Sequence, residues 1–427
     1  MNGYQCFACS TPQSRDFMGF LCPVCGGNLD IRYDYGAAAE EIEQSFIEDE
    51  PGIFRFAPLL PLKQPRPSFP LRVGATPLYR VRVLDAMGGM TRLFLKDETL
   101  NPSASLKDRA SAVAIGHALD VGAKVVAVAS TGNAGSSLAC VAAATGLQSV
   151  IFVPASAPVA KLTQMLAFGA HVLAVRGNYD DAYDLCLAAS AEFGWYNRST
   201  GFNAFTREGK KTCAYEIWRD LGGRVPDRVL VSTGDGNTLS AIWKGWCDLR
   251  AVGLTDRLPK IDCIQSEASA AISGTIRQVR NGRAEEVDWS KVVVGQVRAT
   301  TLADSIAVDR PRDGLAAVKA VIESGGEAVT VTDHEILAAI PEMAHVTGVF
   351  AEPAAAAPWA GLKQMVLKKQ VDRDALVVCI VSGSGLKDIS NTRTSVGDPL
   401  LIEPSLTALR ECLPLTDALN RRDILGS

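Results

Sequence analysis

Lys107 stands at the junction between a loop of small residues and a predicted helix. The loop, residues 101–106, follows the apolar run 93–95, and residues 107–120 are rich in helix formers. A cation at a helix N-terminus opposes the helix macrodipole, and the same field lowers the pKa of an amine. An amine of lowered pKa is a nucleophile. Lys107 is therefore a candidate Schiff-base lysine, the alternative being a solvated lysine at a helix start.

Two further loops of small residues each follow a buried-strand pattern and open a predicted helix. Residues 130–137 follow the apolar run 125–129, and residues 232–238 follow 229–231. In such turns the backbone N–H groups form a cradle for an anion. A reactive lysine with two anion cradles suits a cofactor with one phosphate and a substrate with a carboxylate. Pyridoxal phosphate fits that description.

Four cysteines near the N-terminus have the spacing of a tetrahedral metal site. Cys6 and Cys9 form one pair, and Cys22 and Cys25 form a second pair twelve residues later. Each pair can hold one side of a metal ion, and zinc is the expected metal. Four thiolates leave no open coordination position, so residues 1–35 are interpreted as a structural zinc-ribbon-like module. A ribbon without metal, or four loose thiols, is the alternative.

The composition excludes several classes of function. The chain has 427 residues, 47% of them hydrophobic, and a net charge of −4, which offers no basic surface to nucleic acid. It has no run of 18 apolar residues and no basic stretch followed by an apolar one at the N-terminus, so neither a membrane span nor a signal peptide is expected. Eleven cysteines without a secretion signal indicate reduced thiols and a cytoplasmic location. A small-molecule partner is expected.

From residue 91 onward, short apolar runs alternate with helical patterns, which predicts doubly wound parallel sheets in an α/β fold. The predicted strands are 93–95, 124–129, 149–153, 171–175, 228–231, 261–265 and 375–381. The predicted helices are 107–120, 135–146, 158–168, 179–193, 204–221, 238–252, 333–345 and 352–370. Residues 36–50 are expected to form an acidic helix. Six prolines between residues 51 and 70 predict an extended connector on the surface.

Several motifs resemble those of threonine synthase, a family of pyridoxal-phosphate enzymes with a tryptophan-synthase-β-like fold. They come in the family's order within residues 75–390. The matching segments are the lysine motif 101–109, the substrate loop 130–133, the cofactor-phosphate loop 234–238 with 241–245, and the segments 348–354 and 381–388. Some threonine synthases also carry an N-terminal cysteine module, in agreement with the four-cysteine spacing.

The resemblance implies a fold type II enzyme built from two doubly wound parallel-sheet domains. The zinc-ribbon-like module 1–35 and the connector 36–75 precede a catalytic body of residues 76–427. Within this body a smaller mobile domain, at about 110–205, is inserted in a larger one, and the cofactor lies between them. The resemblance also suggests a homodimer.

The resemblance assigns roles to individual residues. Lys107 is the expected catalytic lysine. The expected cofactor ligands are Lys107, Asn133, Gly234, Asp235, Gly236, Asn237, Thr238 and Ser382. The expected substrate ligands are Ser130, Thr131, Asn133, Ala134, Asn203 and Arg207. Ser382 would face the pyridine nitrogen of the cofactor. Asp235 fits a phosphate cradle only if its side chain points away and its backbone N–H binds the phosphate.

Threonine synthase releases phosphate from the γ-carbon of O-phospho-L-homoserine and adds water at the β-carbon, which is the activity that the resemblance implies. The family's motif Asn-x-x-Arg-x-Glu-Gly-x-Lys departs here, because Thr206 takes the place of the arginine and Arg207 follows it. A shift by one residue turns a guanidinium that binds the leaving phosphate away from it. Lys210 or Lys211 is a possible substitute.

This departure keeps other activities open. One alternative is a paralogue that acts at the β-carbon of another amino acid, such as a cysteate synthase, a serine or threonine dehydratase, or an enzyme for a phosphono or sulfo amino acid. The alternative outside the enzymes is a cofactor-binding protein without turnover. No zinc-hydrolase motif or nucleophile elbow is present in the sequence, so hydrolase chemistry is not expected.

Overall fold

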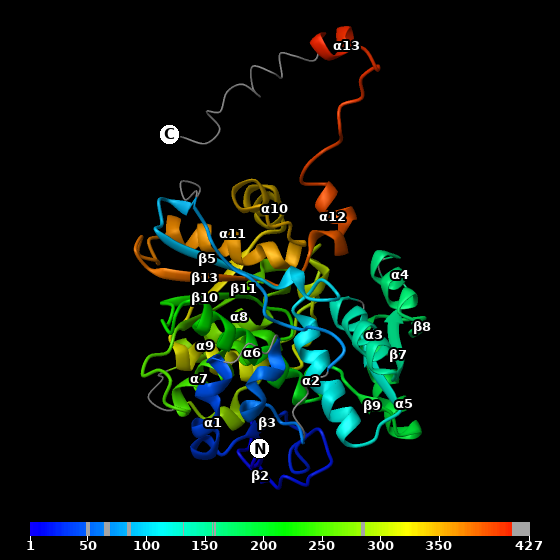
Figure 1. Ribbon diagram of the computed structural model, residues 1–427, viewed down its shortest axis with the longest axis vertical. Helices are drawn as coiled ribbons and strands as arrows, with labels where there is room; N and C mark the ends of the chain where they lie inside the picture. The colour runs from blue at the N-terminus through cyan, green and yellow to red at the C-terminus, as the bar shows by residue number, and fades with distance from the viewer. Residues whose placement is uncertain are drawn as a thin grey trace.

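The computed structural model describes residues 1–47, 52–63, 69–82, 87–130, 132–155, 157, 159–282 and 287–411. The strands form a three-stranded antiparallel sheet near the N-terminus, a central six-stranded sheet and a four-stranded parallel sheet to one side (Figure 1). The prediction of an α/β fold with parallel sheets and a small N-terminal module is confirmed. Among the described residues, no helix has both the length and the apolar character that crossing a bilayer requires.

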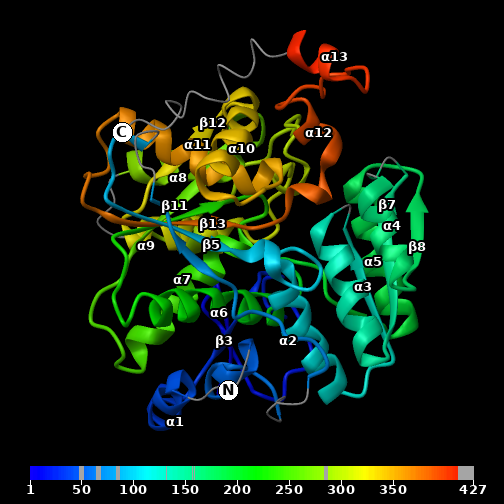
Figure 2. The same cartoon turned by 45° about the horizontal axis from the view of Figure 1, so that its top comes forward.

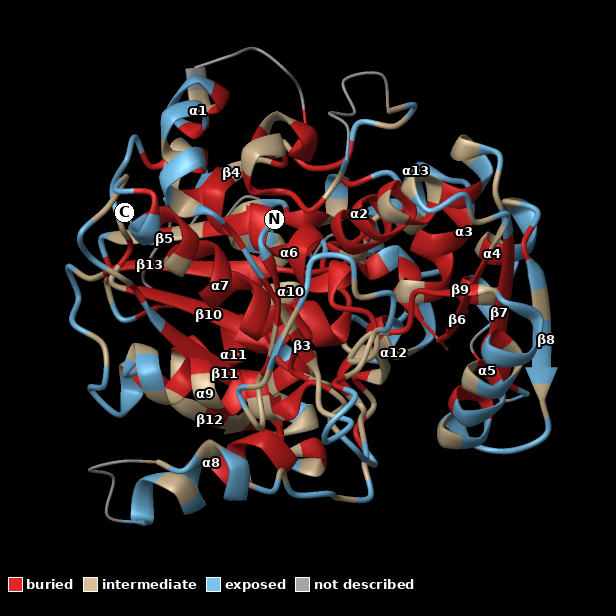
Figure 3. Ribbon diagram, turned by 90° about the horizontal axis from the view of Figure 1, so that it is seen from below, coloured by how far each residue is buried: buried red, intermediate tan, exposed pale blue. Residues whose placement is uncertain are grey.

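The central sheet has the strand order β12, β11, β10, β13, β5, β4. Its strands are β4 (Leu78–Arg80), β5 (Arg92–Asp97), β10 (Arg228–Ser232), β11 (Lys260–Ser266), β12 (Ala328–Val331) and β13 (Leu376–Val381). All neighbours run parallel except β4 and β5. Every residue of β10 and β13 is buried, as expected of central strands with helices on both faces (Figure 3).

Helices cover both faces of the central sheet (Figures 1 and 2). One face carries α10 (Asp333–Thr347) and α11 (Pro353–Leu367). The other face carries α2 (Lys107–Asp120), α6 (Phe205–Asp220), α7 (Asn237–Ala251) and α9 (Gly314–Ser324), with α8 (Ala271–Asn281) beside β12. The strand β12 and the helices α8 and α9 had no counterpart among the predicted elements.

The four-stranded sheet has the order β8, β7, β6, β9 and stands apart from the central sheet (Figure 2). Its strands are β6 (Val125–Ala129), β7 (Gln148–Pro154), β8 (His171–Val175) and β9 (Tyr196–Asn197), and its helices are α3 (Asn133–Thr145), α4 (Val159–Ala167) and α5 (Tyr179–Phe193). No residue of the edge strand β8 is buried. All of these elements fall within residues 110–205, the range predicted for a smaller domain, whose mobility stays a prediction.

The N-terminal module pairs β1 (Gly3–Cys6) with β2 (Pro12–Gln13) and β3 (Leu29–Arg32). Helix α1 (Tyr35–Ile47) follows, and residues 48–50 of the predicted acidic helix lie outside the described residues. The module sits beneath α6 and α7 at the lower end of the molecule in Figure 1. Tyr33 Oη donates to Glu208 Oε2 at 2.6 Å, and Lys244 Nζ donates to the carbonyl of Ile31 at 2.8 Å. The module is therefore fixed to the catalytic body by buried polar contacts.

The expectation of an extended surface connector is wrong for part of its length. Residues Ile53–Leu59 form a 3₁₀ helix, η1. The side chains of Ile53, Phe56 and Leu59 are fully buried. The segment is kinked at Phe56, whose φ of −87° and ψ of 27° are not helical, and all three side chains pack into the core. Burial of these apolar side chains thus outweighed the extended conformation that the prolines predicted. The prolines at 65 and 67 lie outside the described residues.

The carboxyl ends of several parallel strands meet in one region between the two larger sheets. Strand β6 runs into residues 130–133, β10 into residues 233–236, and β13 into residue 382. Strand β5 leads through residues 98–106 to the start of α2. In open parallel sheets, ligands bind outside the carboxyl ends of the strands. The topology therefore brings the segments that the sequence singled out to a common place.

Candidate active site

A cavity of about 210 Å³ lies where these loops converge. It is bordered by both larger sheets, because residues that follow β6 and residues that follow β10 and β13 line it. The predicted site residues on its wall are Lys107, Ser130, Asn133, Ala134, Gly234, Asp235, Gly236, Thr238 and Ser382. The structure thus brings together most of the residues that the sequence indicated. Thr131 lies outside the described residues.

Lys107 is the first residue of α2, as predicted. The preceding loop is held by Asp108, whose carboxylate accepts from the backbone N–H of Ser103 at 2.6 Å and from its hydroxyl at 2.5 Å. Lys387 Nζ donates to the carbonyl of Ser103 at 2.7 Å and to Ser136 Oγ at 2.9 Å. These contacts tie the lysine loop to η7 (Gly385–Lys387) and to α3. The backbone that carries Lys107 is therefore fixed from both sheets.

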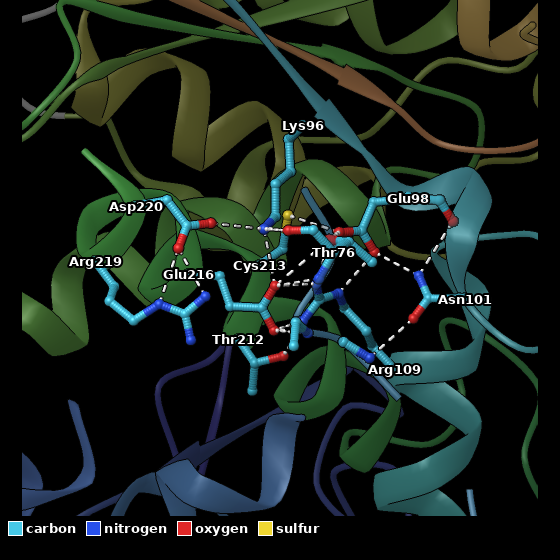
Figure 4. A network of polar contacts seen from close by, with 12 residues as sticks. Thr76, Lys96, Glu98, Asn101, Arg109, Thr212, Cys213, Glu216, Arg219 and Asp220 are labelled. Carbon is cyan, nitrogen blue, oxygen red and sulfur yellow. Dashed lines mark hydrogen bonds and ion pairs between the residues drawn. The ribbon is translucent and has the colours of Figure 1, made fainter. Parts of the chain in front are cut away.

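A buried network of ion pairs anchors α2 two residues beyond Lys107 (Figure 4). Arg109 Nε lies 2.7 Å from Glu98 Oε2, and Arg109 NH2 lies 2.6 Å from Glu216 Oε2. Lys96 Nζ lies 2.8 Å from the same Glu216 oxygen, and Thr76 Oγ1 donates to Glu98 Oε1 at 2.6 Å. All of these side chains are buried. The network joins β5, α2 and α6, and fixes the helix whose first residue is Lys107.

The charges in this network offset the cost of burial. Although burial alone would raise it, the charges of Arg109 and Lys96 hold the pKa of Glu216 far below its usual value. Burial also tends to raise the pKa of Glu98, and the charge of Arg109 again holds it below its usual value. Both glutamates are therefore ionised at neutral pH. Each pair is stable only while both partners are present.

Burial also sets the electrostatics of Lys107 itself. Desolvation lowers the pKa of its amine, although the carboxylates of Asp235 and Glu352 act in the opposite direction. Two buried cations nearby, Arg198 and Lys161, lower it further. A lysine with a depressed pKa holds more of its amine in the neutral, nucleophilic form near neutral pH. The sequence predicted a lowered pKa for Lys107 from its position at a helix start. In the structure, burial is the main cause of the lowered pKa.

The loop between β10 and α7 has the form of an anion cradle. Gly236 has φ +97°, and a Cβ there would lie 2.8 Å from the carbonyl oxygen of Asp313. A Cβ on Gly234 would lie 3.0 Å from the Cα of Ile306. Asp235 Oδ1 accepts from the backbone N–H of Asn237 at 3.0 Å, so this carboxylate caps the start of α7. The backbone N–H of Asn237 is thereby occupied, and the Asp235 carboxylate lines the cavity and acts on the charge of Lys107, so the condition that its side chain point away from the site is not met.

Lys210 places a positive charge behind this loop. Its Nζ donates to Asn237 Oδ1 at 2.6 Å, and no described carboxylate lies within 4.0 Å of it. Burial, together with the charge of Lys107, depresses the pKa of Lys210 strongly. A bound phosphate would compensate these charges, so the loop fits the phosphate of pyridoxal phosphate. The side chain of Asn237 itself faces away from the cavity and donates to Asp313 Oδ2 at 2.8 Å.

The loop after β6 supplies a second set of polar groups. Asn133 Nδ2 donates to Glu352 Oε1 at 2.6 Å, while the buried Asn133 Oδ1 has no hydrogen-bond partner among the residues that the structure describes. A buried polar atom without a partner is costly unless a ligand or water satisfies it. Ser130 Oγ accepts from the backbone N–H of Gly132 at 3.2 Å and shapes the turn. This loop fits a polar ligand in the cavity.

Two hydroxyl groups lie at the end of the central sheet. Ser382 Oγ is 3.5 Å from Ser232 Oγ, and both residues line the cavity. Ser382 follows β13 directly, and its carbonyl accepts from the backbone N–H of Leu106 at 2.9 Å. Ser382 is therefore held one residue from Lys107. A hydroxyl in this position fits a weak hydrogen-bond partner for a pyridine nitrogen.

Two predicted substrate ligands lie outside the cavity wall. Asn203 caps α6, because its Oδ1 accepts from the backbone N–H of Phe205 at 2.9 Å. Arg207 is buried against the N-terminal module, where NH1 donates to the carbonyl of Leu29 at 3.1 Å and NH2 lies 2.5 Å from Asp313 Oδ1. Its guanidinium carbon is 4.4 Å from the centre of the Phe7 ring. The structure therefore does not bring Asn203 and Arg207 to the cavity wall, since the side chains of both make contacts elsewhere.

Sequence reasoning did not assign several residues of the site. Glu352 lies within the matching segment 348–354, so the motif could have revealed it, but no role was attached to it. Residues 304–308, together with Arg310 and Arg312, line the cavity and come from a stretch without helical or strand periodicity. No signal in the sequence pointed to these side chains, because only the packing of a long stretch against the loops that follow β6 and β10 brings them to the site.

The sulfur atoms of the four predicted metal ligands gather in one cluster. The Sγ atoms of Cys6, Cys9, Cys22 and Cys25 all lie within 4.8 Å of one another. Individual separations are 3.4 Å for Cys6–Cys25, 3.7 Å for Cys9–Cys22 and 3.4 Å for Cys9–Cys25. Four thiolates around a zinc ion at about 2.3 Å would lie about 3.8 Å apart. The donor set and its spacing therefore suit a tetrahedral metal ion.

Comparison with known proteins identifies the class to which this fold and site belong. Residues 70–383 match the model of the pyridoxal-phosphate dependent enzymes, and the chain belongs to that family. Within it, the chain is a threonine synthase-like enzyme. It is 35% identical to threonine synthase of Methanosarcina acetivorans over 410 residues, or 96% of this chain and 98% of the relative. It is also 35% identical to threonine synthase of Methanocaldococcus jannaschii, with the same coverage.

Solved structures share the fold at lower identity. Diaminopropionate ammonia lyase from Escherichia coli superposes with a TM-score of 0.63 at 16% identity and covers 89% of this chain and 94% of its own. Threonine deaminase isoform 2 from Solanum lycopersicum gives a TM-score of 0.61 at 19% identity, covering 75% of this chain and 87% of its own. The predicted fold type II architecture is thereby confirmed.

The close approach at Gly236 can be tested by Gly236→Ala. We expect the dissociation constant for pyridoxal phosphate to rise at least tenfold, because the added Cβ meets the Asp313 carbonyl oxygen and disturbs the cradle. Gly253→Ala, at the end of the same helix, is the matched control. Gly253 has φ +80° but nothing within 4 Å of an added Cβ. Titration of the cofactor-free protein measures both constants, and equal values would contradict the assignment of the loop.

The ion-pair network can be tested by Arg109→Met. The free energy of unfolding at neutral pH should fall by about 3–5 kcal/mol, because Glu98 and Glu216 lose their shared partner while remaining buried. Arg280→Met, which breaks the half-exposed pair with Glu327, should cost less than about 1 kcal/mol.

Denaturant unfolding as a function of pH tests the sign of the effect. Because the folded-state pKa of Glu216 is depressed, its stabilisation is present above the usual value of 4.5 and is lost as the pH falls below it. The difference between wild type and Arg109→Met should therefore shrink in acid. A difference that does not depend on pH would show that packing, and not charge, dominates.

Proposed function

We propose that this enzyme is a threonine synthase, which converts O-phospho-L-homoserine and water into L-threonine and phosphate. The observation that carries the proposal is the 35% identity to two archaeal threonine synthases along 96% of this chain. The site supports it, because one cavity combines a buried lysine at a helix start, a glycine-bearing anion cradle and a second polar loop.

The residues of the chain have distinct tasks in this proposal. Bound pyridoxal phosphate supplies a ring that withdraws electrons from an attached amino acid and stabilises negative charge on its carbon atoms. Gly234, Gly236 and Thr238 would hold the phosphate, with Lys210 compensating its charge. Ser382 would stand at the ring nitrogen. Lys107, whose pKa burial depresses, would carry the cofactor and then accept and return protons at the carbon atoms of the substrate.

The loop after β6 would bind the carboxylate of the substrate. The start of α3 directs backbone N–H groups into the cavity, and Ser130 and Ala134 line its wall. Asn133 of this loop donates to Glu352, and its buried side-chain oxygen has no partner within the described part of the chain. This arrangement orients the amino acid toward Lys107, which stands on the opposite helix.

A second candidate is a paralogue that acts at the β-carbon of another amino acid. The observation that favours it is the position of Arg207, which is paired with Asp313 and faces the N-terminal module. Thr206, at the position of the family's arginine, is buried and donates to the carbonyl of Asn203 at 2.7 Å. Lys211 does not substitute, because it lies 2.6 Å from both Glu208 and Asp248.

The assay that decides between these candidates supplies the loaded enzyme with O-phospho-L-homoserine. Equal amounts of phosphate and threonine are expected, and Lys107→Ala should abolish turnover and the absorbance band of the lysine-bound cofactor. Absence of phosphate release from a protein with an intact band would refute the threonine synthase proposal. Phosphoserine with sulfite, and serine or threonine with detection of ammonia, would then identify the paralogue.

We also propose that the four-cysteine cluster holds one structural zinc ion. The four sulfur atoms occupy all positions of a tetrahedral site, and none of the four cysteines lines the cavity. The ion would fix the turns on either side of β2. Its role would be to order the module, whose Tyr33 and Ile31 contact the catalytic body.

Metal analysis and thermal unfolding test this site. One zinc per chain is expected, and Cys9→Ser should lose it and lower the unfolding temperature, because the module loses its cross-link. Cys247→Ser, which changes a cysteine of α7 outside the cluster, should retain the metal. The absorbance band of the cofactor should persist in both variants. Loss of the band in Cys9→Ser alone would contradict a purely structural role.

A further inference from the structure

Arg198 is a buried cation without a carboxylate partner. It directly follows β9, and its side chain is fully buried. Its Nε donates to Ser111 Oγ at 3.2 Å, NH1 to Thr200 Oγ1 at 3.3 Å and NH2 to the carbonyl of Lys107 at 3.5 Å. All three acceptors are neutral, and no described carboxylate oxygen lies within 4.0 Å of the guanidinium.

The other two fully buried arginines show the usual arrangement. Arg109 is paired with Glu98 and Glu216, and Arg207 is paired with Asp313. Burial lowers the pKa of Arg198 to about 10, although the carboxylates of Asp235 and Asp108, neither of them in contact with the guanidinium, act in the opposite direction. A buried charge without a counter-ion is strongly unfavourable for folding. Such a group is retained where a ligand supplies the missing charge.

The position of Arg198 points to the cavity. Thr200 and Lys107, which accept two of its donors, both line the cavity wall. The guanidinium therefore lies directly behind the wall, between the reactive lysine and the Thr200 hydroxyl. An anion held at Thr200 would lie close to this charge.

Two of the expected anionic groups already have binding groups in the cavity, so Arg198 is left for a third. The cofactor phosphate is provided for by the loop 234–238 and Lys210, and the substrate carboxylate by the loop 130–134. Neither group requires the charge of Arg198. A third anion would be the distal group of an amino acid such as O-phospho-L-homoserine. The Thr200 hydroxyl in the cavity wall could contact such an anion, and the guanidinium of Arg198, which donates to that hydroxyl from behind the wall, would supply the positive charge.

We propose that Arg198, acting with Thr200, determines specificity for amino acids that carry a distal tetrahedral oxyanion. Arg198 supplies a positive charge that neither Thr206 nor Arg207 can provide. Thr206 is neutral, and Arg207 is paired with Asp313. The identity of the amino acid rests on the proposed function. Recognition of the anion can be measured by binding alone, without turnover. Arg198 reaches the site from the segment between β9 and α6, eight residues before the position of the family's arginine.

The test measures binding to the cofactor-loaded enzyme without catalysis. The probe is 2-amino-5-phosphonopentanoate, in which a methylene replaces the bridging oxygen of phosphohomoserine so that no phosphate can leave. Its neutral counterpart is norvaline. Titration followed by the absorbance of the cofactor gives both dissociation constants. The wild type should prefer the phosphonate, and Arg198→Gln should reduce that preference by about tenfold to about a hundredfold, with norvaline binding unchanged.

Two further variants separate recognition from structure. Arg198→Lys should restore part of the preference, because it keeps the charge but not the guanidinium. Arg228→Gln is the matched control, since Arg228 is a buried arginine paired with Asp262 at 2.7 Å and does not line the cavity. It should lower the unfolding temperature and keep the preference, whereas Arg198→Gln without ligand should keep or raise the unfolding temperature.

The outcomes distinguish this inference from the proposed function. If Arg198→Gln keeps the phosphonate preference and unfolds at a lower temperature, Arg198 is structural and the inference is overturned, even if the enzyme makes threonine. If the preference depends on Arg198 while phosphohomoserine is not turned over, the inference stands and the proposed substrate is wrong. A substrate with a distal sulfonate or phosphonate would then be sought.

Discussion

The pairing of Arg109 with two buried glutamates is the constraint on which the rest of the site depends. Taking these charges out of water is unfavourable, and only one arrangement of β5, α2 and α6 brings the three partners together. Departures from this arrangement would leave a buried carboxylate without its cation. These pairs set the start of α2, whose first residue is Lys107, relative to the central sheet.

A second junction forms around Asp313. One carboxylate oxygen accepts from Arg207 and from Asn28 of the N-terminal module, and the other accepts from Asn237 at the start of α7. A single side chain thus connects the module, α6 and the cofactor-phosphate loop. Because its backbone carbonyl also faces Gly236, the same residue explains why that position accepts only a glycine without strain. The module and the cradle share one set of contacts.

Local sequence patterns predicted the reactive lysine and the anion cradle, whereas the contacts of other residues near the site depend on long-range packing. Lys107 begins α2 as expected, because a loop of small residues before helix formers is a local signal. The cradle residues Gly234 and Gly236 were predicted for the same reason. Arg198 could not be predicted, since its importance lies in the absence of a partner, which only the folded chain reveals. Arg207 was expected to contact the substrate, but the side of α6 on which it lies directs its guanidinium to Leu29 and Asp313.

The place of Arg207 on α6 has a consequence for how the N-terminal module is attached. On an α-helix, neighbouring residues point about 100° apart, so moving the arginine from position 206 to 207 turns it from one side of α6 to another. At position 207 the guanidinium donates to the carbonyl of Leu29 and lies over the ring of Phe7. An arginine at this position therefore serves the junction between α6 and the N-terminal module, and a single side chain decides whether a positive charge on this helix lies at that junction or elsewhere.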